Sequence, residues 1–408
     1  MILKIIKLGW KNIWRNPTRS SVVIIAVMLG VWAGIFISSF MSGLTKGYLQ
    51  NHLNLSVGHI QITHPQFQDQ FNPRFEIPKS SELLDSLQAA PNITEIRAQS
   101  LATGLAQSAA NSYGVTIHGI EVSGDSSSSH PVQQYITEGD ILKSVSRNPV
   151  VIGSELAERL ELGLRSKIVL SFQDVEGTIT AGSFRVAGIF DSPSNAYDRG
   201  NVLVKQSDLN NLLGNPEAIH KVILKVDNYP MADTYKQQLS SQFPALYFAS
   251  WGDIAPELEY VYESMDISLY IFMIIIVIAL IFSIINTMLM SILERTRELG
   301  MLMAVGMNKV RLFMMILCET IFLTMTGAPL GLLLSWGSIQ LMEDTGIDLS
   351  AFAQGFNEYG MSSTIYPELS GIYYLNITLL IAAAALLSSL YPAWKTLKLK
   401  PVEAIRKI

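Results

Sequence analysis

A charged stretch between two long apolar segments reads Glu294-Arg295-Thr296-Arg297-Glu298-Leu299-Gly300-Met301-Leu302-Met303-Ala304-Val305-Gly306, and the organisation of the whole chain follows from it. Its first five residues carry four formal charges, which cannot lie in hydrocarbon, so the stretch must lie at or outside a membrane face. Its second half places apolar residues at helical spacing beside small ones. A helix that is exposed to water and apolar on one side favours docking into a partner's groove. We therefore interpret residues 294–306 as a docking helix for a soluble protein.

Around this stretch, four apolar runs are long enough to cross a membrane as helices: 20–43, 267–293, 312–342 and 371–394. The second run would be about 40 Å long as a helix, against a hydrocarbon core of about 30 Å, so we expect it to protrude as a stalk. The composition agrees with a membrane protein, because 49% of the 408 residues are hydrophobic and only 15% are charged. A cleaved signal peptide is the alternative for the first run. That run is too long for one and lacks a small-residue cleavage site, which favours a retained helix.

The distribution of lysine and arginine predicts the orientation. Residues 1–19, 294–311 and 395–408 together carry 14 basic and 3 acidic residues. By contrast, residues 343–370 carry 5 acids and no base, and the long insert 44–266 carries 15 bases and 25 acids. We therefore expect both termini and the docking helix in the cytoplasm, and the large insert on the outer side.

These patterns together define a fold class and a division into parts. We expect an α-helical membrane protein with four transmembrane helices and a large mixed α/β extracytoplasmic domain between the first two. The expected parts are an amphipathic elbow helix (1–19), the first span (20–43), the α/β domain with stalk helices (44–266), the second span (267–293), the coupling loop (294–311), the third span (312–342), a short external loop (343–370), the fourth span (371–394) and a cytoplasmic tail (395–408).

Short apolar runs between turn signals predict the elements of the α/β domain. The expected strands are His59–Thr63, Val115–Ile120, Val150–Ile152, Ile168–Phe172, Phe184–Ile189, Val202–Val204 and Val222–Val226. The expected helices are Ser81–Ala89, Ser154–Leu160, Ser207–Leu213 and Met231–Ser241, with Leu44–Leu53 and Leu258–Met265 as stalks. Residues 126–129 are expected to form a flexible tip.

Motifs that carry chemistry are absent from the sequence. Its six histidines show no HExxH or paired-ligand spacing, and it contains no GxSxG motif and no phosphate-binding GxxxxGK[ST] motif. We therefore expect no catalytic residue, no metal site and no cofactor bound by this chain. The basic stripe of residues 2–16 precedes an apolar run, which favours contact with anionic membrane lipids over nucleic acid.

Inside the expected spans, Glu319 is the most informative residue, because a carboxylate in a membrane helix is costly. It either has a functional role or ties helices together as a hydrogen-bonded or protonated acid, and we favour the second interpretation. Asn286 and Thr287 in the second span are its expected partners. Gly327 and Gly331 form a small-residue face that predicts close helix packing.

At this point the sequence resembles a known family. Residues 294–306 resemble the signature loop of the FtsX-like, MacB-type permeases of ABC transporters, in which this loop is the coupling helix that sits in a groove of the ATP-binding subunit. Residues 12–19, Tyr391–Trp394 and Pro401–Arg406 resemble the entry and exit of that family's membrane part. Residues 151–157 and 184–189 resemble its periplasmic domain. Without a fused ATPase segment, and with the strand Gly58–Ile62, the chain is most similar to the lipoprotein-releasing LolC/LolE-type branch.

The resemblance implies a non-catalytic permease in the bacterial inner membrane that works by mechanotransmission. Its expected partners are two copies of an ABC ATP-binding subunit that carries ATP and magnesium, a second permease copy or sister permease, a periplasmic chaperone or adaptor, and a lipoprotein or other hydrophobic cargo. The expected coupling residues are Glu294, Arg295, Arg297, Glu298, Leu299, Gly300, Leu302, Ala304 and Gly306. Among them, Arg295 and Arg297 would meet acids on the ATPase, and Leu299, Leu302 and Ala304 would fill its groove.

Three functions stay open within this resemblance. Lipoprotein release is the leading hypothesis. Efflux of a drug, peptide or toxin with a periplasmic partner is the first alternative, and signalling to an external hydrolase, as FtsX does, is the second. A non-transport adhesin or receptor is disfavoured, because it would not need residues 294–306.

Overall fold

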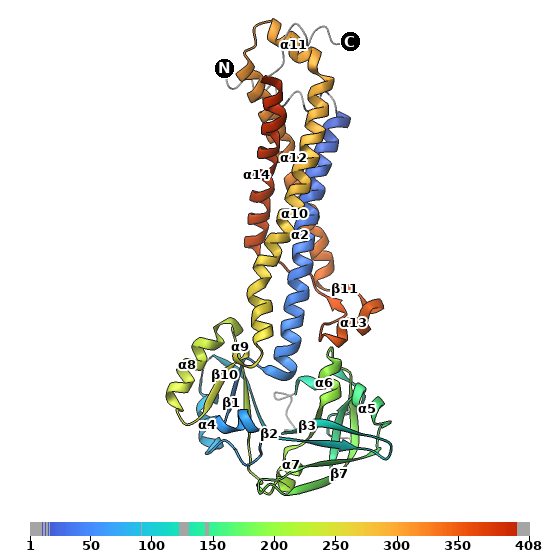
Figure 1. The fold of residues 1–408 in the computed structure, drawn as a ribbon, viewed down its shortest axis with the longest axis vertical. Coiled ribbons are helices and arrows are strands. Elements are labelled where there is room, and N and C mark those ends of the chain that lie inside the picture. Colours follow the sequence, from blue (N-terminus) through green and yellow to red (C-terminus); the bar gives the residue numbers. More distant parts are fainter. Residues whose placement is uncertain are drawn as a thin grey trace. The chain divides into compact units, whose positions relative to one another are not determined.

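A computed structural model describes Trp10, Ile13, Arg15 and residues 17–397, except 91, 122–129 and 143–146. The expected tip at 126–129 and most of the elbow helix and tail lie outside the described residues. The chain divides into two compact units (Figure 1). The membrane unit contains residues 1–45, 263–348 and 365–408, and the α/β unit contains residues 46–262 and 349–364.

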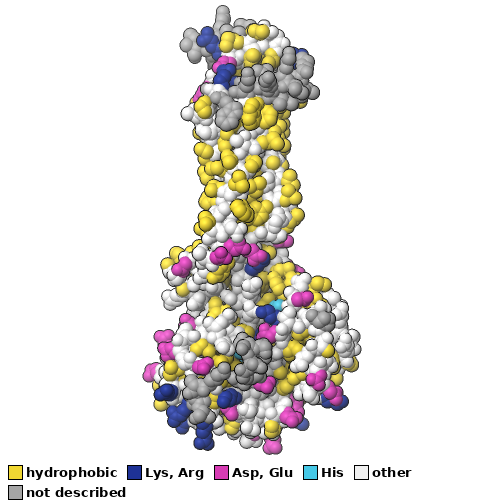
Figure 2. All heavy atoms as spheres, turned by 180° about the vertical axis from the view of Figure 1, so that it is seen from behind, with side chains coloured by type: hydrophobic (Ala, Val, Ile, Leu, Met, Phe, Trp, Pro, Cys, Tyr) yellow, Lys and Arg dark blue, Asp and Glu magenta, His cyan; other side chains and the backbone are white. Residues whose placement is uncertain are grey.

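The membrane unit is built on four helices that are long and apolar enough to cross a membrane, among the residues that the structure describes. They are α2 (Pro17–His52), α10 (Pro256–Glu294), α12 (Lys309–Glu343) and α14 (Gly371–Leu397). The short helix α11 (Thr296–Ala304) lies between α10 and α12, and β11 (Ile347–Asp348) follows α12. Figure 2 shows hydrophobic side chains over the outer surface of these helices, as expected for a surface that faces lipid.

Two glycines of α12 bring it close to α2. A Cβ atom on Gly327 would lie 2.8 Å from the Ile24 carbonyl oxygen, and one on Gly331 would lie 2.6 Å from that of Met28. Any larger side chain would push the two helices apart. These are the small residues that the sequence assigns to helix packing.

The α/β unit contains a ten-stranded sheet with the order β10-β1-β9-β2-β3-β8-β5-β7-β4, in which β6 pairs with β2 and β7. Its strands are β1 (Ile60–Thr63), β2 (Ile93–Gln107), β3 (Ser112–Ile120), β4 (Ile136–Gly139), β5 (Pro149–Gly153), β6 (Lys167–Gln173), β7 (Ile179–Phe190), β8 (Asn201–Lys205), β9 (Lys221–Val226) and β10 (Tyr247–Ser250). A separate two-stranded sheet pairs β11 with β12 (Thr364–Ile365).

One half of the α/β unit has the topology of a split βαβ motif. Strands β10, β1, β9 and β2 are antiparallel neighbours, and α4 (Ser80–Gln88) and α8 (Ala232–Gln242) connect β1 to β2 and β9 to β10. Leu83 and Leu87 are buried at helical spacing, so α4 presents an apolar face to the core of this half. The second half, β3 to β8, is inserted between β2 and β9 and has its own apolar core.

The remaining elements are short. They are η1 (Leu53–Val57), α3 (Pro65–Gln70), η3 (Pro131–Tyr135), α5 (Ser154–Arg159), α6 (Asn195–Gly200), α7 (Gln206–Leu213), η4 (Tyr229–Met231), α9 (Trp251–Ile254), η5 (Ser350–Phe352) and α13 (Ala353–Glu358). The structure confirms the predicted fold class, four long apolar helices with a mixed α/β domain between the first two.

The seven predicted strands and four predicted helices of the α/β domain are also present, as β1, β3, β5 to β9, α4, α5, α7 and α8. The long strand β2 was not predicted, because Glu95, Arg97 and Gln99 interrupt its apolar pattern. Polar side chains on a strand at the centre of a sheet are held by tertiary contacts that a local pattern does not show.

Candidate coupling site

The segment around α11 folds into a tightly closed turn between α10 and α12. Gly306 adopts a φ of 101°, and the Met307 amide donates to the Leu302 carbonyl at 3.0 Å. This is a Schellman motif, which needs a residue in the left-handed region and therefore favours glycine. The Asn308 side chain then accepts from the Val310 amide at 3.3 Å and caps α12. The chain thus passes from α11 to α12 through only four residues.

Charged side chains connect this turn to its neighbours. Arg295 Nη1 lies 3.2 Å from Glu319 Oε1, and Arg295 Nε lies 3.3 Å from Glu298 Oε2. Arg15, before α2, donates a short hydrogen bond to Glu298. The side chains of Arg295 and Glu319 are only 12% and 10% exposed. The network of Arg15, Glu298, Arg295 and Glu319 therefore joins the segment before α2 to α11 and α12.

The two ends of this network differ in strength. Burial alone would raise the pKa of Glu298, but the hydrogen bonds from Arg15 and Arg295 outweigh it and lower that pKa. The Arg15–Glu298 pair is half-exposed, so solvent screens most of its energy. Arg295 and Glu319 lie in a mostly apolar environment, where removing one partner leaves an uncompensated charge. The inner pair therefore fixes the position of α11.

The apolar residues of α11 divide into a buried and an exposed face. Leu299 and Met303 are buried, and Gly300 lies with them. Met301, Leu302 and Val305 are exposed, with Val305 at 90%. We call these three residues the α11 patch. Arg297, Ala304 and Gly306 are exposed beside it, and Glu294 ends α10.

The structure changes several residue roles expected from the sequence. Arg295 is paired with Glu319, so it does not fit the expected role of meeting an acid on the ATPase, whereas Arg297 is exposed and still fits that role. Leu299 is buried, whereas its expected role requires an exposed side chain, and the exposed apolar residues beside Leu302 are Met301 and Val305. Met301 and Val305 belong to the apolar residues of this stretch in the sequence, but the expected groove-filling set leaves them out, because a short helix with apolar residues on both sides does not show which side is buried.

Glu319 also has a different partner from the expected ones. Its carboxylate is held by Arg295, while Thr287 donates to the Ser283 carbonyl oxygen and Asn286 is exposed on α10. The role of Arg15 was missed as well. Its charge was visible, but 283 residues separate it from Glu298, so no local pattern indicates the pair.

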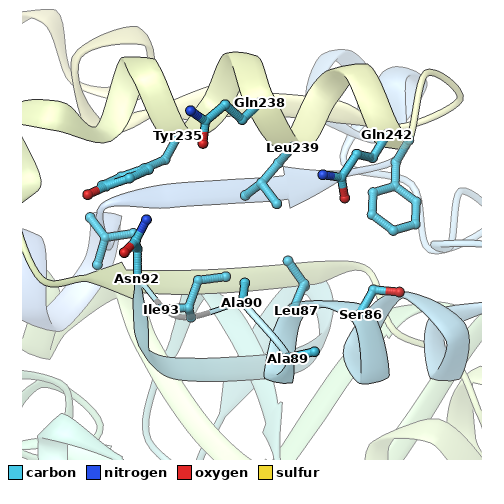
Figure 3. A pocket seen from close by; sticks show the side chains of 12 residues that line it. Ser86, Leu87, Ala89, Ala90, Asn92, Ile93, Tyr235, Gln238, Leu239 and Gln242 are labelled. Carbon is cyan, nitrogen blue, oxygen red and sulfur yellow. The ribbon is translucent and has the colours of Figure 1, made fainter.

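The α/β unit offers a second candidate surface, a groove between α4 and α8 (Figure 3). Its volume is about 370 Å³, within the lower range of small-molecule sites. Apolar side chains line the walls of the groove, and amide side chains line its rim. None of the lining residues carries a formal charge, although both helices carry charges elsewhere. The lining residues are Ser86, Leu87, Ala89, Ala90, Asn92, Ile93, Val226, Tyr235, Gln238, Leu239, Gln242 and Phe243.

Comparison with known proteins identifies both units. Residues 270–401 match the family model described as FtsX-like permease C-terminal. Residues 20–241, more than half of the chain, match the model described as MacB-like periplasmic core domain. The first description is that of a permease and the second that of a periplasmic domain, so the matched residues are those of a permease.

Individual relatives are distant. The chain is 30% identical over 123 residues to the macrolide export ATP-binding/permease protein MacB of Chlorobium luteolum, which covers 30% of this chain and 16% of that protein. It is 22% identical over 295 residues to the lipoprotein-releasing system transmembrane protein LolC of Xylella fastidiosa, covering 65% of this chain and 66% of that protein. The chain thus spans less than two thirds of the length of either relative.

Among solved structures, the periplasmic region of MacB from Actinobacillus actinomycetemcomitans is similar with a TM-score of 0.35 and 16% identity, covering 52% of this chain and 97% of that one. The family assignment rests on the two model matches. The chain belongs to the ABC transporter permeases of the FtsX/MacB type, multi-pass membrane proteins with a MacB-like periplasmic domain.

Proposed function

We propose that this chain is the transmembrane subunit of an ATP-driven complex, in which separate ABC ATP-binding subunits dock on α11. The observation that carries the proposal is the α11 patch, three exposed apolar side chains on α11 and at its C-terminal end, on a helix that the network with Glu319 holds in place. A rigid apolar surface beside an exposed cation, Arg297, suits a groove that is apolar inside and acidic at its rim.

Charge segregation supports the side on which docking takes place. The segments at both termini and around α11 carry 14 basic and 3 acidic residues, and the positive-inside rule assigns such segments to the cytoplasm. The acidic insert then lies on the periplasmic side of a bacterial inner membrane. ATP and magnesium would bind to the partner, not to this chain.

Movement of α11 would reach the periplasmic side through α10. This helix runs without a break over 39 residues, from Pro256 to Glu294, and ends directly before α11. A continuous helix transmits a displacement along its axis without requiring a pore. We propose this mechanotransmission for a pair of permeases, either two copies of this chain or this chain with a sister permease.

Docking can be tested with two variants of the exposed surface. Arg297→Glu reverses the exposed charge, and Leu302→Asp places a carboxylate in the α11 patch. Burying an unpaired charge in an apolar groove costs enough to weaken binding by about tenfold or more. We expect both variants to lose the co-purified ATPase and its stimulated hydrolysis rate. Arg311→Glu, which reverses an exposed charge of the same loop outside α11, is the matched control.

The docking proposal is wrong if Arg297→Glu and Leu302→Asp keep the stimulated hydrolysis rate while the control behaves as the unmodified chain does. Co-purification from native membranes gives an independent test. The absence of any ATP-binding subunit from that preparation would reject the whole proposal.

For the cargo, we propose release of lipoproteins from the outer face of the inner membrane. The similarity to LolC extends over 65% of the chain and supports this cargo. Similarity to MacB supports the alternative, efflux of a drug, peptide or toxin. A co-purified lipoprotein chaperone favours the first, an adaptor or outer-membrane channel the second, and a cell-wall hydrolase a signalling role.

The groove between α4 and α8 offers a testable contact for such cargo. Its uncharged apolar walls suit an acyl chain, and its amide rim suits the ester and amide bonds that join acyl chains to a lipoprotein. Ala89→Trp fills the groove from an exposed position, and we expect it to slow lipoprotein release from proteoliposomes. Gln237→Trp, an exposed position of α8 outside the groove, is the control. Equal rates for the two variants would exclude the groove as the cargo contact.

A further inference from the structure

The segment between α12 and α14 belongs to the α/β unit, although its neighbours in the sequence belong to the membrane unit. Residues 349–364, which we call the strap, group with residues 46–262. The chain therefore passes between the two units at four points. Two of them lie within the continuous helices α2 and α10, and the other two are the ends of the strap.

Glu358 fastens the strap to α6. Its carboxylate accepts a hydrogen bond from Asn195 Nδ2 at 3.3 Å and lies 3.6 Å from Arg199 Nη2. The Glu358 side chain is 54% exposed, so this contact is weak by itself and needs a second one to hold the strap.

Gly360 of the strap makes the second contact, with residues at the C-terminal end of α2. A Cβ atom on Gly360 would lie 2.5 Å from His52 Nε2, and its φ of 76° is one that favours glycine. Asn51 Nδ2 also donates to the Gly360 carbonyl oxygen at 3.4 Å. A side chain at residue 360 would therefore strain the backbone and require the His52 side chain to move.

Helix α6, which the strap contacts, is held against the sheet by close contacts. α6 connects β7 to β8, and its Asp198 lies so close to Gly153 at the end of β5 that a Cβ there would be 2.2 Å from the Asp198 carbonyl oxygen. Ser192, just after β7, bonds to the Asp198 carboxylate through its amide at 2.9 Å. A displacement of α6 would therefore act on three strands of the sheet.

Along the chain, a single long helix, α12, connects the coupling site to the strap. α11 is joined to α12 by the closed turn at Gly306 and Asn308, and α12 runs without a break to Glu343, six residues before the strap. This route is separate from α10, which leaves α11 in the other direction.

We propose that the strap is a second mechanical link between the membrane helices and the α/β unit, with Glu358 and Gly360 as its positioning residues. It carries movement from α11 through α12 to α6, while α10 carries movement to α9 and β10. This inference rests on the proposed function, because the movement that the strap carries begins with ATPase docking on α11.

Hydrogen exchange of the full permease–ATPase complex in nanodiscs tests the link. Gly360→Ala adds the Cβ that clashes with His52, and Glu358→Lys reverses the charge that faces Arg199. Without nucleotide, we expect both variants to increase exchange in the strap and α6 by about tenfold, and to leave α4 and α8 unchanged. Gly355→Ala is the matched control within the strap, because nothing lies within 4 Å of its Cβ position.

A charge swap distinguishes the loss of the Glu358–Arg199 contact from a general destabilisation of the fold. The double variant Glu358→Lys with Arg199→Glu restores an ion pair, and we expect it to return α6 exchange toward the unmodified value. With ATP and vanadate, α6 and α9 should both respond in the unmodified complex, whereas α6 alone should lose its response in Gly360→Ala.

Two outcomes overturn the link: unchanged α6 exchange in both single variants without nucleotide, or an unchanged nucleotide response of α6 in Gly360→Ala. The failure of the proposed function looks different. In that case no part of the unmodified complex responds to nucleotide, while the nucleotide-free comparison still decides whether Glu358 and Gly360 hold the strap to α6.

Discussion

Two buried carboxylates, Glu319 of the membrane unit and Asp198 of the α/β unit, are stabilised in opposite ways. Glu319 is 8% exposed and forms an ion pair with Arg295 at 3.2 Å. Asp198 is fully buried and forms no ion pair within the described part of the chain. Its carboxylate accepts from the Ser192 amide and hydroxyl groups and from the Ser154 hydroxyl group.

The protonation of Asp198 follows from these neighbours. Burial raises its pKa to about 7, the hydrogen bonds from Ser192 oppose that rise, and the nearby charge of Asp191 adds to it. Asp198 is thus an acid that folding holds close to its protonated form. Glu319 instead has a cation beside it that compensates its charge.

The two units therefore require different properties of a buried acid. The negative charge of Glu319 is itself stabilising, because it holds Arg295, and with it α11, at a fixed position. At Asp198 the size of the side chain and its hydrogen bonds are stabilising, because α6 packs against Gly153. The charge of Asp198 is destabilising, because it opposes burial. Removing the charge should therefore destabilise the first site and stabilise the second.

The largest expected effect is that of Glu319→Gln. Among the described residues it leaves Arg295 with Glu298 as its acidic partner, and breaking a buried pair costs about 3–5 kcal/mol. Because Glu298 remains, we expect a loss of about 3 kcal/mol. The loss should appear as a lower midpoint of thermal unfolding in nanodiscs and as faster amide exchange in α11.

The double variant Arg295→Met with Glu319→Leu sharpens this prediction. Replacing both partners by apolar residues of similar size is often neutral, so it should restore most of the lost stability. Glu343→Gln, an exposed acid at the other end of α12, is the control. If the midpoint of thermal unfolding of Glu319→Gln equals that of the unmodified chain, the pair with Arg295 does not hold α11.

The two residues of the inner pair differ in how visible they are in the sequence. Glu319 was recognisable because it is the one charge in a long apolar run, a pattern that depends on composition alone. Its partner was not, because Arg295 lies among other charges at a membrane face and was expected to point to an ATPase. The direction of a side chain depends on how α11 turns after α10, which no periodicity in the sequence encodes.

Asp198 and the strap show the same limit in the α/β unit. Asp198 follows two serines and an asparagine in a polar stretch that is typical of a surface loop. It packs against Gly153, which lies 45 positions away in the sequence. Residues 349–364 lie within the segment 343–370 that the sequence predicts as a short external loop, and their tertiary contacts, among them those of Glu358 and Gly360, group them with the α/β unit.

Asp198→Asn should have a smaller effect of opposite sign. The raised pKa of Asp198 means that its contribution to stability is fully present below pH 4 and is lost as the pH rises toward 7. Asparagine can still accept from the Ser192 amide and donate to the Ser192 hydroxyl group. We therefore expect the variant to be more stable than the unmodified chain by on the order of 1–3 kcal/mol at pH 8, and to show no gain at pH 4.

Thermal unfolding of the full chain at the two pH values measures this difference. Asp85→Asn, an exposed acid on α4, should change neither midpoint. If Asp198→Asn destabilises the chain equally at pH 4 and pH 8, the charge of Asp198 is needed as that of Glu319 is, and the contrast between the two acids is wrong.

The smallest expected effect is that of Arg15→Ala, at the exposed end of the same network. Its pair with Glu298 is half-exposed, so removing it should cost less than about 1 kcal/mol at low salt. A salt concentration of about 1 M shortens the Debye length to about 3 Å and should abolish the cost, whereas the loss in Glu319→Gln should persist because that pair is buried. Unfolding midpoints of both variants at low and high salt measure the contrast, with Arg15→Lys as the control that keeps the charge. A salt-independent loss in Arg15→Ala would mean that Arg15 acts through packing, and that the network holds α11 at both of its ends.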